Sequence, residues 1–114
     1  MDPLEEEILL LYREPAIGAS YCNTYGEENI KNLVGKYQSL DEGGMNRMRE
    51  MVVDFSQSMD LTSSFVSVGV LHALGLTREV EAAYRVAGTR QDAQSYIHHF
   101  DIGKSLADHF LLKP

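Results

Sequence analysis

The chain has 114 residues, of which 44% are hydrophobic and 24% charged, and this length and composition predict one globular domain spanning residues 1–114. Its net charge of −7 argues against a nucleic acid or an anionic membrane as a partner, and no apolar run approaches the ~20 residues of a membrane span. The lone Cys22 cannot form an internal disulfide, and the acidic N-terminus is unlike the basic start of a signal peptide. We therefore expect a cytoplasmic protein.

A first helix is predicted from Asp2 to the residues just before Pro15. Asp2 suits an N-cap, and a proline follows it at the first helical position. The inner stripe of this helix comprises Leu4, Ile8, Leu11 and Tyr12. Glu5, Glu6 and Glu7 fill the first turn, where the helix dipole favours acids. Two interpretations fit these glutamates: a solvated helix face, which we favour, or an anionic edge for a basic partner.

Residues 14–26 form the one long segment without helical periodicity. It contains Tyr21, Asn23 and Tyr25, and tyrosine with small polar residues is typical of contact loops. The alternative, slightly favoured, is that the same aromatic side chains cover one end of the core.

Two further helices are predicted in the middle of the chain. One covers residues 27–40, and a turn follows at residues 41–44. The next helix carries the clearest apolar stripe, which comprises Met45, Met48, Val52, Phe55 and Met59. Its polar face comprises Asn46, Arg47, Arg49, Glu50, Asp54 and Gln57. We interpret the methionines as core packing, with an adaptable binding groove as the alternative.

The most apolar stretch lies within residues 60–88 and predicts two helices joined by a tight turn. The first is apolar nearly all round over residues 65–74, which is typical of a helix buried among neighbours. Asp60, Thr62 and Ser63 offer N-caps for it, Gly75 suits its C-terminal end, and Thr77 suits the N-cap of the second helix.

A strand over residues 64–71 is the competing interpretation, because the valines at positions 66, 68 and 70 alternate with small residues. The length of the run and the helix punctuation at both ends favour the helix. The capped helix–glycine–helix unit at residues 60–88 resembles one hairpin of a HEAT-type helical array.

A last helical segment follows a near capping box at residues 89–92, Thr-Arg-Gln-Asp. Apolar residues at helical spacing run from Ala93 to Leu111, and Gly103 is expected to break or kink the segment. Together these elements predict an all-α fold: a compact single-domain bundle of about five to seven helices.

The best cluster of chemically active residues lies on this last segment. His98, Asp101, Ser105 and Asp108 fall on one helical face, with His99 and His109 nearby. Imidazole and carboxylate groups can bind a metal or act as a base with its orienting group. The spacing matches no established motif, and a solvated polar face explains the same residues. We therefore predict no catalytic site, no metal and no cofactor.

The charge distribution points to a binding function. Residues 1–57 hold 11 acidic and 5 basic side chains, whereas residues 58–114 hold 6 and 5. We predict a small acidic protein–protein interaction module that inhibits or scaffolds a basic protein partner, and in size and charge the chain resembles bacterial immunity proteins and inhibitors. The predicted binding residues are Glu5, Glu6, Glu7, Tyr21, Asn23, Tyr25, Glu27 and Glu28. The alternative is a small helical enzyme or a metal- or ligand-binding domain that uses the His98, Asp101 and Asp108 face.

Overall fold

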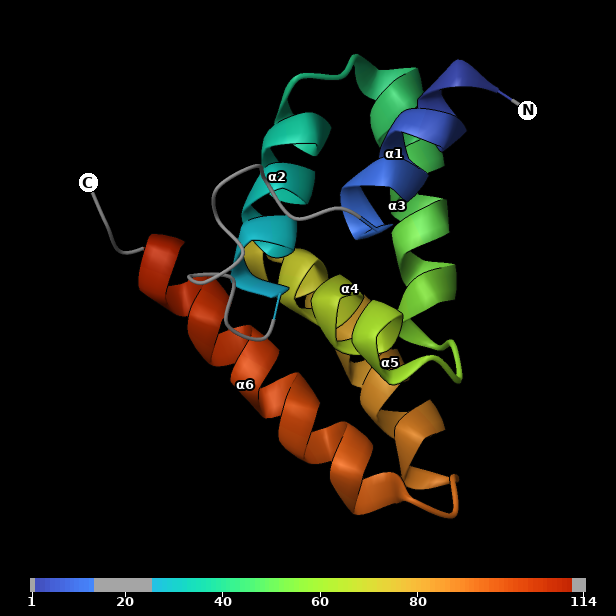
Figure 1. Ribbon diagram of the computed structural model, residues 1–114, viewed down its shortest axis with the longest axis vertical. Coiled ribbons are helices and arrows are strands. Elements are labelled where there is room, and N and C mark those ends of the chain that lie inside the picture. The colour runs from blue at the N-terminus through green and yellow to red at the C-terminus, as the bar shows by residue number, and fades with distance from the viewer. Residues whose placement is uncertain (1, 14–25, 112–114) are drawn as a thin grey trace.

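Six α-helices account for nearly all of the protein that the computed structural model describes, which is residues 2–13 and 26–111 (Figure 1). They are α1 (Pro3–Arg13), α2 (Glu27–Gln38), α3 (Glu42–Ser56), α4 (Leu61–Ala73), α5 (Thr77–Gly88) and α6 (Ala93–Leu111). No strand occurs within those described residues. The predicted all-α bundle of five to seven helices is therefore confirmed.

Helix α4 lies at the centre of the bundle. It packs against α2, α3, α5 and α6, and every residue from Ser64 to Leu71 is buried (Figure 1). The segment that fits either a helix or a strand is a helix, and helices packed on several sides of it bury its side chains in every direction. Of the three N-cap candidates, Asp60 is the one that caps the helix, since its carboxylate accepts a hydrogen bond from the Ser63 N–H at 3.0 Å.

Helices α4 and α6 cross at two glycines. A Cβ atom added to Gly103 would lie 2.8 Å from the Phe65 carbonyl oxygen, and one added to Gly69 would lie 3.2 Å from the Gly103 carbonyl oxygen. The expectation that Gly103 breaks or kinks the last helix is wrong, because α6 is one continuous helix. Gly103 is there for the close approach of two backbones, which no larger residue allows.

The turn between α4 and α5 follows the predicted glycine signal. Gly75 has a φ of 75°, and the Leu76 N–H donates to the Leu71 carbonyl at 3.0 Å, which closes a Schellman motif. Thr77 is not the N-cap, however. Leu76 occupies that position without a side-chain hydrogen bond, and Thr77 begins the helix. The helical hairpin at residues 60–88 exists, but α4 also packs on three other helices, so the hairpin is part of a bundle.

Three predicted boundaries differ from the structure. The turn at residues 41–44 is the start of α3: Asp41 is its N-cap and accepts the Gly44 N–H at 2.8 Å. Helix α3 ends at Ser56, so Met59 leaves the apolar stripe and is 80% exposed. The capping box at residues 89–92 is also wrong, because Thr89 ends α5 and its hydroxyl donates to the Val86 carbonyl at 2.7 Å.

Helix α1 is fastened to the bundle by polar and aromatic contacts. Ile8 is fully buried, and the Tyr12 and Ser67 hydroxyl groups lie 2.5 Å apart. The Tyr12 ring also lies 4.7 Å from the ring of Phe55, centroid to centroid. Asn29 donates to the Leu11 carbonyl at 2.8 Å, which places the start of α2 beside the end of α1. Across the described residues, no helix combines the length and apolar character that a membrane crossing needs.

Candidate functional site

The predicted acidic residues of α1 are partly used within the molecule. Glu5 lies 3.7 Å from Arg47 of α3, and Glu7 forms an ion pair with Lys36 of α2. Arg47 also pairs with Asp2, just before α1. These pairs bridge helices, so most of this charge holds α1 in place, and an incoming partner would have to compete for it.

The glutamates of α1 and those of α2 form two separate groups. Glu27 and Glu28 lie in the first turn of α2, beside the end of α1, whereas Lys36 of the last turn meets Glu7. Eight residues of helix separate the two groups, which corresponds to about 12 Å along the axis. The other predicted binding residues, Tyr21, Asn23 and Tyr25, lie outside the described residues, as does Cys22.

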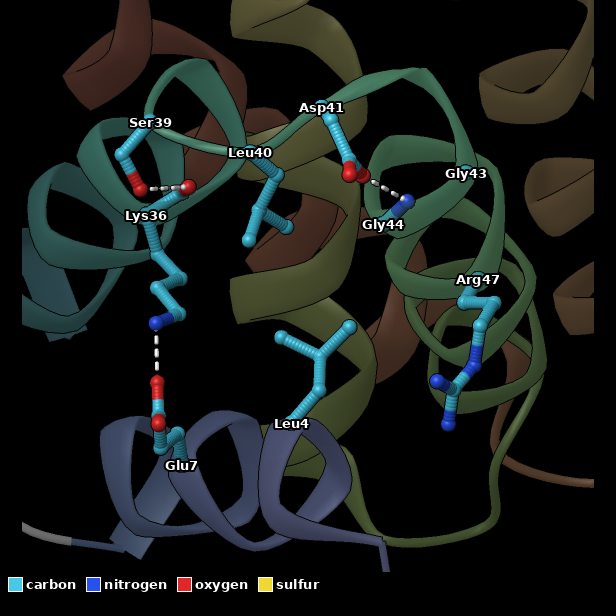
Figure 2. A pocket seen from close by; sticks show the side chains of 9 residues that line it. All are labelled: Leu4, Glu7, Lys36, Ser39, Leu40, Asp41, Gly43, Gly44 and Arg47. Atoms are coloured by element: carbon cyan, nitrogen blue, oxygen red, sulfur yellow. Dashed lines mark hydrogen bonds and ion pairs between the residues drawn. The ribbon is translucent and has the colours of Figure 1, made fainter.

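A cleft of about 560 Å³ opens where α1, α2 and α3 meet. Figure 2 shows Leu4 and Leu40 pointing toward each other across it, with the Glu7–Lys36 pair on one side and Arg47 on the other. Both cations of the cleft already have carboxylate partners. The positive charges that line the cleft are therefore balanced by ion pairs between helices of the protein itself.

The outer surface of α3 carries carboxylates without such partners. Glu42, Glu50 and Asp54 are exposed and lie on one ridge at spacings of multiples of four residues, with Asn46 between them. Among the described residues none of the three has an ion-pair partner, and Arg49 donates to the Asn46 side chain at 3.0 Å. We call these four residues the α3 ridge. Asn46, Glu50 and Asp54 belong to the polar face predicted for this helix, which is the second candidate for the binding face after the acidic N-terminal residues.

The predicted polar face of α6 does not converge on one site. His98, Asp101 and Ser105 line a shallow hollow of about 300 Å³ on the protein surface. Asp101 accepts a hydrogen bond from the Tyr84 hydroxyl of α5 at 2.6 Å, and Asp108 lies 2.6 Å from the His72 ring of α4. Each carboxylate is thus engaged with a different neighbouring helix.

The remaining histidines, His99 and His109, do not line the hollow that His98 borders. The His99 ring packs 5.6 Å from the Phe65 ring, and its Nδ1 lies 2.7 Å from the Ser95 carbonyl oxygen. His109 is exposed near the end of the described chain. Within residues 2–13 and 26–109, no three histidine, cysteine, aspartate or glutamate side chains are grouped to hold a metal ion.

A second groove, between α5 and α6, was not anticipated. The Lys104 ammonium lies 5.1 Å from the centroid of the Tyr84 ring, and Lys104 lines two hollows of about 230 and 380 Å³. Burial raises the pKa of the Tyr84 hydroxyl, and the hydrogen bond to Asp101 raises it further. His72 lines the smaller hollow. The sequence signal for this groove is His72, a polar residue on the nearly apolar α4.

No protein-family model, curated protein or solved structure matches the chain in any of three comparisons. The function therefore has to be argued from the surface itself.

Proposed function

We propose that this protein is a small acidic interaction module that binds a basic surface of a protein partner and thereby inhibits or scaffolds it. The observation that carries this proposal is the α3 ridge. Three exposed carboxylates, free of ion-pair partners among the described residues, project from one rigid helix. Glu42 and Asp54 are twelve residues apart, which is about 18 Å along the axis and within the span of an ordinary protein interface.

The charges support this choice of partner. A net charge of −7 repels polyanions, and free carboxylates attract lysine and arginine side chains without first breaking an internal ion pair. The largest hollow described above, the cleft of about 560 Å³ between α1, α2 and α3, is open to solvent, and its two cations are paired with carboxylates of the protein. Flat, charged surfaces suit proteins, whereas small ligands are usually bound in deep pockets.

The α1 glutamates play a secondary role in this proposal. To pair with basic residues of the partner, Glu5 and Glu7 would first have to give up Arg47 and Lys36. The loss of these internal ion pairs cancels part of the binding free energy that the new pairs provide. We therefore expect the α3 ridge to contribute more to the rate of association than the first turn of α1 does.

The experiment begins with capture of the partner from the native host on immobilised protein at low salt. Eluted proteins are identified as salt rises, and the strongest is purified for surface plasmon resonance. The variant Glu50→Gln/Asp54→Asn should associate more slowly, and its association rate should depend less on salt.

The matched control is Glu79→Gln/Glu81→Gln, which removes the same charge from α5. It should leave the association rate nearly unchanged. Equal association rates for both variants and the parent protein would contradict the proposal, as would a captured partner with an acidic surface.

A further inference from the structure

The link between α3 and α4, residues 57–60, is held unusually firmly for a surface connection. Three consecutive carbonyl groups of the link, those of residues 57, 58 and 59, each accept a side-chain hydrogen bond at 2.5 Å. The donors come from three different places: Arg90 between α5 and α6, Ser64 of α4 and Tyr96 of α6. The Asp60 N–H adds a bond to the Ser58 hydroxyl at 3.0 Å. The backbone of the link is therefore fixed by the rest of the fold.

This fixed backbone presents an apolar side chain to solvent. Met59 is 80% exposed, whereas the next most exposed large apolar side chain of the described residues, Leu10, is 49% exposed. An isolated apolar side chain on a mobile loop would need no explanation. Met59 differs because the backbone entropy of the link has already been lost in folding, so binding through Met59 costs side-chain ordering but little additional backbone ordering.

The surroundings of Met59 have the layout of an interface centre. Met59 borders a hollow of about 410 Å³ that Tyr96, Arg90 and Asp92 also line. The Arg90 guanidinium lies 4.9 Å from the centroid of the Tyr96 ring and bonds the link, so it is occupied within the protein. Tyrosine, arginine and methionine are enriched in interfaces relative to other surface.

Carboxylates stand around this apolar position. Asp60 is the next residue, and Asp92 lies on the rim of the hollow. Hydrogen bonds from the Ser63 hydroxyl and N–H lower the pKa of Asp60, so this carboxylate is charged at neutral pH. Asp54 of the α3 ridge lies in the last turn of α3, three residues before the link begins at residue 57. The acidic ridge therefore continues in sequence into the Met59 surface.

We infer that Met59 is the apolar anchor of the interface with the basic partner, and this inference rests on the proposed function. The partner it fits is a protein with a small apolar socket for the methionine side chain. Lysine or arginine residues on the rim of that socket would face Asp54, Asp60 and Asp92. An apolar centre inside a charged rim is the arrangement in which a truncated anchor mainly accelerates dissociation.

Position-specific crosslinking in the native host tests this inference. The photoreactive p-benzoylphenylalanine is placed at position 59, at position 46 on the α3 ridge, or at position 94 on the exposed start of α6. Positions 59 and 46 should yield the same crosslinked protein, with a basic surface, and position 94 should yield none. A crosslink from position 46 alone would overturn the inference and leave the proposed function intact. No crosslink from either position would overturn both.

The kinetic arm uses the purified partner. Met59→Ser should raise the dissociation rate by about tenfold or more and leave the association rate nearly unchanged. Leu10→Ser is the matched control, since it removes another exposed apolar side chain, and it should change neither rate. Thermal unfolding of both variants should match the parent protein, which excludes misfolding. An unchanged dissociation rate for Met59→Ser would overturn the inference.

Discussion

The Tyr12 and Ser67 hydroxyl groups meet at 2.5 Å where α1 contacts α4, and Ser67 is fully buried. Such a pair stabilises the fold mainly because each hydroxyl would be costly to bury alone. At the scale of single residues, this contact is what ties the first helix to the central one.

Tyr12→Phe should therefore lower the free energy of unfolding by about 1–2 kcal/mol, because it leaves the buried Ser67 hydroxyl without its tyrosine partner. Urea unfolding measures the change. The double variant Tyr12→Phe/Ser67→Ala should cost less than the two single changes added together, since it removes both partners. Tyr37→Phe is the control: the Tyr37 hydroxyl makes no hydrogen bond within the described residues, and its loss should have little effect. Strict additivity would show that the two hydroxyls do not interact.

At the scale of elements, the crossing of α4 and α6 sets how closely the two helices approach. The atom nearest to a Cβ on Gly103 is a backbone oxygen, which cannot rotate away as a side chain can. Any side chain at position 103 would have to push one helix away from the other.

Gly103→Ala should consequently destabilise the protein by about 1–3 kcal/mol, as overpacking of a core does. Gly35→Ala provides the opposite case, because nothing lies within 4 Å of a Cβ at that exposed position inside α2. It should stabilise the protein by about 0.5–1 kcal/mol through the higher helix propensity of alanine. Denaturant midpoints of the two variants should move in opposite directions. A shift in the same direction would mean that the α4–α6 contact is looser than described.

The same elements show which features a sequence can predict. Asp60 and Gly75 act through hydrogen bonds between residues at most five positions apart, and the sequence predicts the glycine end of α4 and offers Asp60 as one of three N-caps. The surroundings of Gly103 and Met59 are formed by segments far away in the chain, which a local pattern does not contain. The local patterns therefore predicted a helix break at Gly103 and a core position for Met59, and both predictions were wrong. The same difference between local and long-range contacts applies to the candidate site. Acid clusters are visible in sequence, but the pairing of Glu7 with Lys36 or Glu5 with Arg47 requires the fold.

At the scale of the whole molecule, two tyrosines in different parts of the fold resist ionisation. Burial raises the pKa of Tyr12, although its bond to Ser67 opposes the shift. Burial and then Asp101 raise the pKa of Tyr84. An unfolded chain releases these protons near the ordinary tyrosine pKa of 10, while the folded chain keeps them. The contribution of these two protonated tyrosines to the free energy of unfolding is therefore fully present below about pH 10. It is lost as pH rises further.

Urea unfolding from about pH 8 to about pH 11 should show stability falling over the upper part of that range. The variant Tyr12→Phe/Tyr84→Phe should fall less steeply, because two of the groups that titrate only in the unfolded state are gone. Parallel curves for the variant and the parent protein would show that these tyrosines ionise equally in both states.

The central position of α4 has a consequence for how the chain is made. Its closest packing partner, α6, is translated 20 residues after α4 ends and is complete only at Leu111. At ordinary translation rates the ribosome needs roughly 2–8 s to add the residues from the end of α4 to the end of α6. During that interval α4, the most apolar of the described helices, lacks α6 on its glycine face. The glycine face of α4 can therefore be covered by α6 only after nearly all of the described chain has been made.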